Sequence, residues 1–173
     1  MRNVKIIAAV SEDAVYGVDG KLPWRSPEDL RYFKQVTRNS TVIMGRATWD
    51  SLGKYKPLPD RENVVVTSQN TDAPEGVILA NSLDAAIEIA SCDGIFVIGG
   101  KMLWLEAIEK GYATELLVTK VGVTVLPCDG ALICEELANP NKFYNFHPEP
   151  VKDILDISGP VPLKLLMRRY IRH

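Results

Sequence analysis

Short apolar runs alternate with amphipathic segments along this chain. Apart from Lys5, residues 4–10 are continuous in valine, isoleucine and alanine, which is the pattern of a strand buried on both faces. Runs of the same kind predict further strands at residues 41–44, 63–67, 77–79, 95–98 and 115–119. Near the carboxyl end, residues 153–157 and 163–167 flank Ser158, Gly159 and Pro160, which predicts a hairpin with a turn of several residues.

Apolar residues recur at helical spacing between the early strands. One helix is predicted to start at Ser26, because a capping serine is followed by Pro27 at the first helical position and by acids in the first turn. The three predicted stripes are Leu30, Phe33 and Thr37; Leu83, Ala86, Ile87 and Ala90; and Trp104, Leu105 and Ile108.

Strands that alternate with helices and end in a hairpin predict an α/β fold. We expect a mostly parallel central β-sheet flanked by helices, with the C-terminal hairpin adding antiparallel strands at one edge. A length of 173 residues fits a single domain over residues 1–173, and a monomer is the common state at this size.

Composition excludes several classes of protein. Hydrophobic residues make up 46% and charged residues 24%, as in ordinary folded domains. The net charge of -2 gives no electrostatic case for a nucleic-acid or anionic-membrane binder. The basic segment at 168–172 is interpreted as a solvated strand end. Lys5 interrupts any secretory signal, and no apolar run is long enough to cross a membrane.

Cysteine and histidine are scarce. Cys92, Cys128 and Cys134 are odd in number and irregularly spaced, so we expect no disulfide framework and a reducing, cytoplasmic setting. With only two histidines, neither a zinc site of usual spacing nor a histidine-based triad is predicted.

Three predicted strands end in residues suited to phosphate. The strand at 95–98 runs into Gly99 and Gly100, the strand at 41–44 runs into residues 45–48, and the strand at 63–67 runs into Ser68 and Gln69. Ligands of open α/β sheets bind at the carboxyl ends of strands, where glycines allow close approach and helix N–H groups are free. Any one end could be a plain turn; the three together favour a ligand that contains a diphosphate.

Residues 13–24 follow the first strand and contain Gly17 and Gly20 before a rigid Pro23-Trp24 pair. A long loop with glycine hinges at a strand's carboxyl end suits an active-site lid. The alternative is a surface loop, which the apolar end of the segment disfavours.

Asp29 is the leading candidate for chemistry. It could be a helix N-terminal acid like Glu28, worth about 0.5 kcal/mol. However, Phe33 and Val36 lie four and seven residues on, which places Asp29 at the end of an apolar stripe. A carboxylate facing an apolar cleft could bind a planar amino-pyrimidine edge with both oxygens.

These motifs together resemble dihydrofolate reductase, in the order and near the spacing of that family over about the first 120 residues. The resemblance is carried by LPW at 22–24, PEDL at 27–30 followed by FK at 33–34, VIMGR at 42–46 followed by TW at 48–49, PLP at 57–59 followed by Arg61 and Asn63, and VIGG at 97–100. It implies NADPH-dependent reduction of 7,8-dihydrofolate to 5,6,7,8-tetrahydrofolate, which supplies one-carbon carriers for thymidylate and purine synthesis. It also implies sensitivity to antifolate inhibitors.

The resemblance implies roles for individual residues. Asp29 matches the sole ionisable catalytic group, which binds the 2-amino and N3 edge of the pterin, and Leu22 and Trp24 match the lid. The positions that match substrate contacts are Ile7, Asp29, Leu30, Phe33, Leu52, Leu58, Arg61, Ile98 and Thr119, with Arg61 clamping the glutamate α-carboxylate. The positions that match NADPH contacts are Ala9, Tyr16, Gly17, Gly45, Arg46, Ala47, Thr48, Thr67, Ser68, Gln69, Gly99, Gly100, Lys101, Met102 and Leu103, with Arg46 and Ser68 nearest the 2′-phosphate.

The chain departs from the family pattern at a few positions. Ala47 and Met102 stand where a basic or polar residue is common, so preference for NADPH over NADH rests on less charge. Trp104 replaces a typical tyrosine and lacks its hydroxyl. Tyr55 and Lys56 lengthen the turn before Pro57.

Two other functions fit parts of this pattern. A reductase of the same fold that acts on another heterocycle, such as the pyrimidine reductase of riboflavin synthesis, would not need Asp29 or the Arg61 clamp. A catalytically silent nucleotide-binding or assembly subunit would not need an intact lid.

Overall fold

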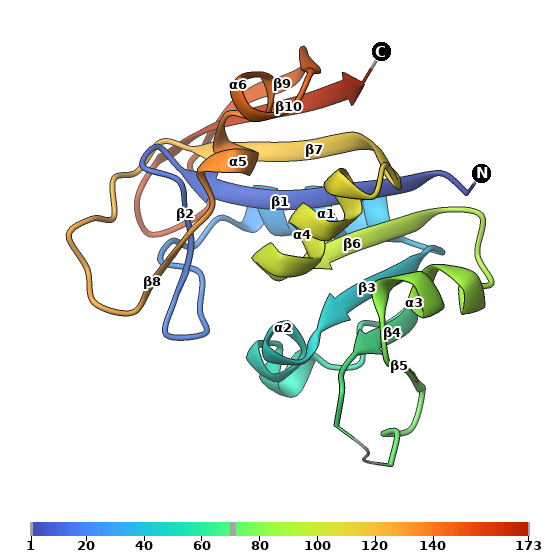
Figure 1. Cartoon of the computed structure of the whole chain (residues 1–173). Helices are drawn as coiled ribbons and strands as arrows, with labels where there is room; N and C mark the ends of the chain where they lie inside the picture. Colours follow the sequence, from blue (N-terminus) through green and yellow to red (C-terminus); the bar gives the residue numbers. More distant parts are fainter. Residues whose placement is uncertain (1, 70–71, 173) are drawn as a thin grey trace. The chain divides into compact units, whose positions relative to one another are not determined.

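The computed structural model describes residues 2–69 and 72–172 (Figure 1). The chain divides into two compact units, one made of Met1–Ile6 and Val36–Thr114, the other of Ile7–Gln35 and Glu115–His173. Strand β1 (Val4–Ser11) and helix α1 (Pro27–Thr37) each pass from one unit to the other. None of the described helices is long and apolar enough to span a membrane.

The first unit contains parallel strands in the order β5-β4-β3-β6-β1. Its other strands are β3 (Thr41–Gly45), β4 (Glu62–Val66), β5 (Val77–Ala80) and β6 (Ile95–Gly99). Ile43 of β3 lies opposite Val64 of β4 and Val97 of β6. All three of these side chains are fully buried, which explains why these strands read as continuous apolar runs.

Three α-helices of the first unit follow directly from its strands or turns: α2 (Arg46–Ser51), α3 (Leu83–Ile89) and α4 (Lys101–Glu109); a 3-10 turn spans Gly53–Tyr55. Ser82 caps α3, and the predicted α3 stripe is buried as expected. In α4 the prediction was partly wrong. The buried residues are Leu103, Trp104, Ala107 and Ile108, whereas Leu105 is only half-buried, because the face that packs inward is centred one residue away.

The second unit contains the predicted C-terminal hairpin. Strand β10 (Leu163–Arg172) pairs antiparallel with β7 (Ala113–Val121) on one side and with β9 (Phe146–Asp156) on the other. Both hairpin strands are longer than predicted. Pro148 and Pro150 lie within β9, which stands last in the sheet order of residues 2–69 and 72–172, next to β10. Prolines are accepted on such an edge strand.

The remaining elements of this unit were not predicted. The segment expected to be a lid loop contains β2 (Val15–Val18), which pairs antiparallel with β8 (Ala131–Ile133) as a separate two-stranded sheet (Figure 1). Two short helices, α5 (Glu135–Ala138) and α6 (Pro140–Phe143), precede β9. Each of these elements is too short to give a clear periodic signal.

Candidate active site

Helix α1 places Asp29 in its first turn. The backbone N–H of Asp29 donates to Ser26 Oγ at 3.1 Å, so Ser26 acts as the predicted N-cap. Only 8% of Asp29 is exposed. In contrast, Glu28 is more exposed and forms an ion pair with Arg31. The two adjacent acids therefore have different environments, and Asp29 is the buried one.

Burial changes the protonation of Asp29. The pKa of its carboxyl is about 6, above the ordinary 3.8. Loss of solvent contact is the largest cause and raises the pKa, a hydrogen bond from the Thr119 hydroxyl lowers it, and the negative charge of Asp156 raises it. Thr119 lies on β7 and is 2% exposed. A carboxyl that titrates near neutral pH and is held by one hydroxyl is typical of functional sites.

The apolar face of α1 beyond Asp29 is open. Leu30 is 55% exposed. Phe33 is half-buried. Exposed apolar side chains next to a buried carboxylate are suited to contact a flat ligand that has both a polar edge and an apolar body.

The predicted lid ends in a residue fixed to the core. Trp24 is 9% exposed and packs with Val121, Leu165 and Met167, so this part of the segment is not a plain surface loop. Its Nε1 is buried without a hydrogen-bond partner within residues 2–69 and 72–172. A ligand atom that accepts a hydrogen bond would satisfy this N–H group. Leu22 is 45% exposed.

Asp13 anchors the start of the same segment. Its carboxylate accepts hydrogen bonds from the Val125 N–H at 3.0 Å and the Leu126 N–H at 2.7 Å, and from the Ser11 hydroxyl. These bonds hold the pKa of Asp13 below its usual value although burial opposes them. No local pattern marks this role, because Val125 and Leu126 are more than 110 residues away.

Strands β3 and β6 of the first unit end in Gly45 and Gly99, which lie close together. A Cβ added to Gly45 would lie 3.9 Å from both the Gly100 nitrogen and the Gly99 oxygen. A Cβ added to Gly99, whose φ is +142°, would lie 3.0 Å from Thr48 Oγ1. The Gly99–Gly100 peptide bond is cis. At Gly99 the positive φ and the close approach of Thr48 favour glycine, whereas a Cβ at Gly45 would lie at ordinary contact distance from the backbone of Gly99 and Gly100.

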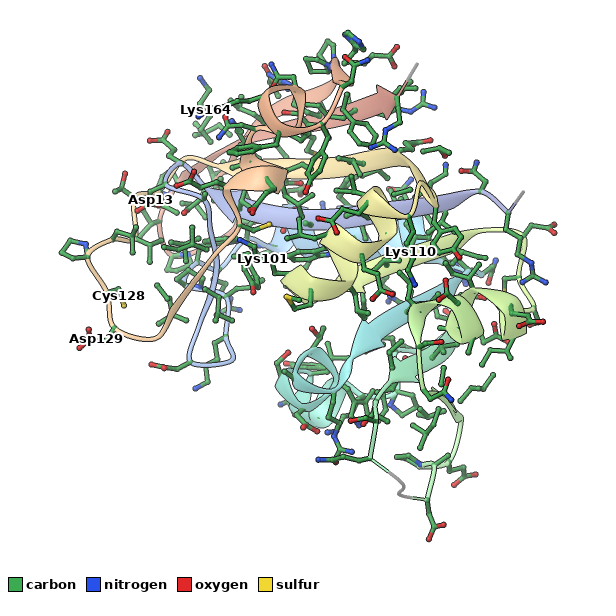
Figure 2. All side chains as sticks on the ribbon, in the orientation of Figure 1. Asp13, Lys101, Lys110, Cys128, Asp129 and Lys164 are labelled. Atoms are coloured by element: carbon green, nitrogen blue, oxygen red, sulfur yellow. The ribbon has the colours of Figure 1, made fainter. Side chains whose placement is uncertain are left out.

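The helices that follow these glycines begin without side-chain caps. Neither Gly45 before α2 nor Gly100 before α4 supplies a side-chain hydrogen bond to its helix. Backbone N–H groups at such a start favour anions. Figure 2 marks Lys101 and Lys110 at the two ends of α4. The donor set therefore fits the diphosphate of a dinucleotide.

The cradle formed by Gly45, Gly99, Gly100 and the start of α4 has charged and exposed side chains near it. Arg46 Nε donates to both oxygens of Asp50 at 3.1 and 3.2 Å, so a phosphate would compete with Asp50 for it. Met102 is 78% exposed, and Ser68 and Gln69 are exposed as well.

Arg61 is held in place by neighbours in the first unit. Its Nε donates to the Pro59 carbonyl at 2.8 Å, and its Nη1 donates to Thr37 Oγ1 at 3.2 Å. Partial burial lowers the pKa of Arg61, against a smaller opposite effect of Asp60. Arg61 is therefore a partly buried, hydrogen-bonded cation.

Asn63 is a supporting residue to which sequence reasoning gave no role. Its Oδ1 accepts from the Leu58 N–H, and its Nδ2 donates to the Leu58 carbonyl, both at 2.9 Å. Leu58 is 9% exposed and Leu52 is half-buried. The asparagine thereby shapes the turn that carries Leu58 and Arg61.

Trp104 uses its polar atom within the protein. Its Nε1 donates to the Val97 carbonyl at 3.2 Å, and the residue is 4% exposed. The indole that replaces the family's usual tyrosine is thus tied to the backbone of β6.

The predicted site residues divide between the two units. The second unit holds Asp29, Thr119, Leu22, Trp24, Ile7, Ala9, Tyr16, Gly17, Leu30 and Phe33. The first unit holds Leu52, Leu58, Arg61, Ile98, and the predicted NADPH positions from Gly45 to Leu103. The structure brings together the residues around Asp29 in the second unit and the glycines of the cradle in the first.

Several known proteins are similar to this chain. A family model described as dihydrofolate reductase matches residues 3–141. Dihydrofolate reductase of Buchnera aphidicola is 42% identical over 125 residues, which cover 72% of this chain and 75% of that protein. Dihydrofolate reductase type 3 of Salmonella typhimurium is 43% identical over 119 residues, covering 68% and 71%.

A solved structure is similar over nearly the whole length. Dihydrofolate reductase from Enterococcus faecalis, complexed with NADP(H) and RAB-propyl, matches with a TM-score of 0.79 and 26% identity. The match covers 99% of this chain and 96% of that one, so the α/β fold with its closing hairpin is shared. With its matched residues, its relatives and its fold in agreement, the chain belongs to the dihydrofolate reductase family.

Proposed function

We propose that this protein reduces 7,8-dihydrofolate to 5,6,7,8-tetrahydrofolate with NADPH, and that Asp29 is the group that binds and polarises the pterin. The observation that carries the role of Asp29 is its burial in the first turn of α1, with Thr119 beside it. The same-fold reductases of other heterocycles would have no need of this carboxylate.

Asp29 would bind the pterin through its two carboxylate oxygens. The 2-amino group and N3 of a pterin form a pair of adjacent donors, and a carboxylate accepts from such a pair as it does from guanidinium. Since the pKa of Asp29 is about 6, most of the carboxyl is ionised at pH 7. The Thr119 hydroxyl keeps one oxygen oriented.

The proton that N5 of the substrate gains need not come from Asp29 directly. A negative charge at the far edge of the ring favours a pterin whose N5 binds a proton, so a water molecule can deliver it. Asp29 then acts by electrostatics and by positioning. Exclusion of bulk water by the segment that carries Leu22 and Trp24 strengthens this effect.

The protein's contribution to hydride transfer is orientation. NADPH, when bound, supplies the hydride for C6 of the pterin. The glycines at 45, 99 and 100 would admit the diphosphate against the start of α4. We assign Arg46 and Ser68 to the 2′-phosphate, Thr67 and Gln69 to the adenosine, and Ala9, Tyr16 and Gly17 to the nicotinamide. Arg46 would exchange Asp50 for the phosphate.

The rest of the substrate needs apolar contacts and a cation. We assign Leu30, Phe33, Leu52 and Leu58 to the p-aminobenzoyl ring and Arg61 to the glutamate α-carboxylate. Because Pro59 and Thr37 fix Nε and Nη1 of Arg61, its orientation is set before the substrate binds, which reduces the entropy cost of binding.

We further propose that the chain acts as a monomer in the cytoplasm. None of the three cysteines forms a disulfide, and an odd set of this kind suits a reducing compartment. Diaminopyrimidine antifolates would occupy the Asp29 half of the site.

The test is the loss of NADPH absorbance on addition of 7,8-dihydrofolate to the purified protein. We expect turnover that depends on both compounds and that diaminopyrimidine antifolates block. Size-exclusion chromatography with light scattering on the same sample tests the monomer. Absence of dihydrofolate-dependent NADPH oxidation at every pH between 5 and 7.5 would overturn the proposed function.

A further inference from the structure

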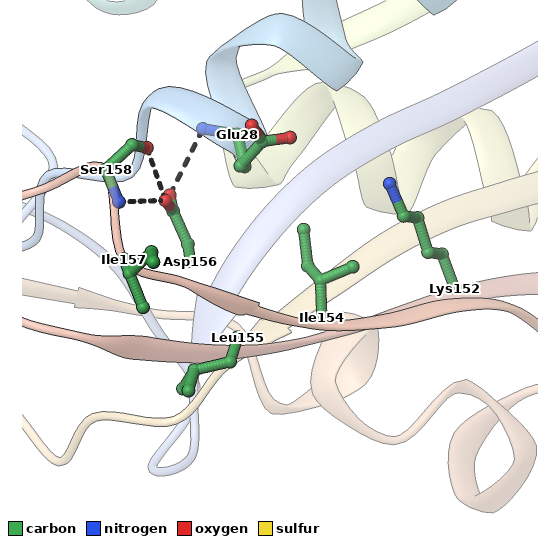
Figure 3. Close-up of a pocket in the computed structure, with 7 residues that line it drawn as sticks. All are labelled: Glu28, Lys152, Ile154, Leu155, Asp156, Ile157 and Ser158. Carbon is green, nitrogen blue, oxygen red and sulfur yellow. Dashed lines mark hydrogen bonds between the residues drawn. The ribbon is translucent and has the colours of Figure 1, made fainter.

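Asp156 is a buried acid that the function described so far does not use. It is the last residue of β9 and is 2% exposed. It lies beyond residue 141, where the match to the family model ends. Its neighbours in the fold are the turn of the C-terminal hairpin and the start of α1 (Figure 3).

The Asp156 carboxylate accepts hydrogen bonds from both of these elements. Ser26 Oγ donates to Oδ2 at 2.6 Å, and the Glu28 N–H donates to the same oxygen at 3.1 Å. The Ser158 N–H donates to Oδ1 at 3.0 Å, and so does the Ser158 hydroxyl. Figure 3 shows the bonds from Glu28 and Ser158 converging on this carboxylate. Asp156 therefore caps α1 from a distant part of the chain.

These bonds keep Asp156 ionised. Burial alone would raise its pKa, but the four donors outweigh burial and hold the pKa at about 2. At any pH at which the enzyme works, Asp156 thus carries a negative charge at the start of α1.

Ser26 connects this charge to Asp29. The Ser26 hydroxyl donates to Asp156 and its oxygen accepts from the Asp29 N–H at 3.1 Å. The two acids are thus joined through one side chain. Their charges also interact, because the anion of Asp156 raises the pKa of Asp29. In such a pair the acid with more donors ionises first and the other retains its proton longer.

Several other charged groups on α1, β7 and β9 form ion pairs. On α1, Glu28 pairs with Arg31. On β7, Glu115 pairs with Arg169 of β10. On β9, Asp153 pairs with Arg168 of β10, and Lys152 shares a pocket of about 270 Å³ with Asp156. Tyr32 is neutral near pH 7, since burial and then Glu115 and Asp29 raise its pKa.

We propose that Asp156 is a positioning residue for the reaction: through Ser26 and the Glu28 N–H it fixes the first turn of α1, and it places a second negative charge beside the carboxylate of Asp29. This inference rests on the proposed role of Asp29. Its consequence is that Asp29 binds a proton more tightly than it would through burial alone. A residue of the C-terminal hairpin therefore raises the proton affinity of the acid that binds the pterin.

The test is an Asp156→Asn variant, which has nearly the same shape and removes the charge. The titration of Asp29 is followed in the ligand-free protein by NMR of carbon-13-labelled aspartate carboxyls, assigned with Asp29→Asn. We expect the pKa of Asp29 to fall by about half a unit to one unit. The pH profile of hydride transfer should move in the same direction. Asp156→Glu, which keeps the charge, should retain the parental profile.

Asp153→Asn is the matched control. It removes a carboxylate from the same strand that is 56% exposed and bound to Arg168, and it should leave the Asp29 titration unchanged. If Asp156→Asn does not fold, Asp156→Ser is measured in its place, since its hydroxyl can still accept a bond from the Glu28 N–H.

An Asp29 titration that is unchanged in the neutral variant would overturn the inference, as would an equal shift in Asp153→Asn. The proposed function has a separate test, because Asp29→Asn reports on it by activity. If Asp29→Asn kept its activity while the NMR titration moved in Asp156→Asn, the role of Asp29 would be wrong and the coupling would still hold.

Discussion

Asp29 is a residue with 8% of its surface exposed, and an ionised carboxyl in such a place is destabilising at neutral pH. Asp29 has one hydroxyl partner in Thr119 and a like charge in Asp156, which is less compensation than a buried acid usually receives. Its sequence signal was the capping Ser26 and the apolar stripe behind it. Such a group is kept where function requires it, so its removal should improve stability and abolish activity.

The stability of Asp29→Asn should depend on pH with a definite sign. The folded pKa of about 6 lies above the ordinary 3.8, so between these values the folded protein binds more protons than the unfolded one, and this residue's contribution to stability falls as pH rises. We therefore expect Asp29→Asn to be more stable than the parent at pH 7.5, by at most about 3 kcal/mol, with the difference shrinking toward pH 4. Urea unfolding at both pH values measures it; a variant less stable than the parent at pH 7.5 would contradict the burial described above.

The Arg61 clamp should show in the ligand's tail. Arg61→Lys keeps a charge but loses the planar fork, so we expect the affinity for dihydrofolate to fall about tenfold to a hundredfold. The affinity for a pterin without the glutamate should change by less than about twofold. Fluorescence titration with both ligands makes the comparison; equal losses for the two would refute the clamp.

At the residue scale, the sequence could identify local signals but not distant partners. Ser26, Pro27 and Asp29 lie within four positions of one another, so cap and acid were found together. Asp156 lies 130 residues from Ser26, and Arg61 lies 24 residues from Thr37. No local pattern marks such pairs, and the roles of Asp156, Asn63 and Asp13 required the fold.

Elements were predictable where burial imposes a long pattern. The parallel strands of the first unit are buried on both faces, so their apolar runs gave their positions to within about two residues. Strands β2 and β8 contain only a few residues and include Gly17, so periodicity had little to act on. The first half of β9 contains two prolines, so its sequence pattern does not indicate a strand. The position of β9 at the edge of the sheet permits these prolines.

The segment at 13–24 should depend on Asp13 for its position. Asp13→Ala removes the acceptor of the Val125 and Leu126 N–H groups, so we expect faster hydrogen exchange at these two amides and a several-fold slower hydride transfer. Glu12→Ala is the matched control, because Glu12 is exposed and its bond to the Val123 carbonyl uses its backbone N–H. Slow hydride transfer in both variants, or in neither, would contradict the anchoring role.

For the whole molecule, a net charge of -2 hides local charge of the opposite sign. The protein takes two anionic ligands, and the groups proposed to meet their charges are Arg46, Arg61 and the uncapped start of α4. Each of these is local to one turn or strand end. Net charge gave no electrostatic case for a nucleic-acid binder, and it carried no information on these sites. The whole-chain match to the Enterococcus faecalis enzyme supports the fold prediction, including the hairpin.

The most direct measurement of the central claim is single-turnover hydride transfer from NADPH to 7,8-dihydrofolate by Asp29→Asn, recorded from pH 5 to pH 8. We expect the rate at neutral pH to fall by about a hundredfold or more, with partial recovery in acid, where the substrate is protonated in solution before it binds. A rate close to that of the parent protein at neutral pH would contradict the account.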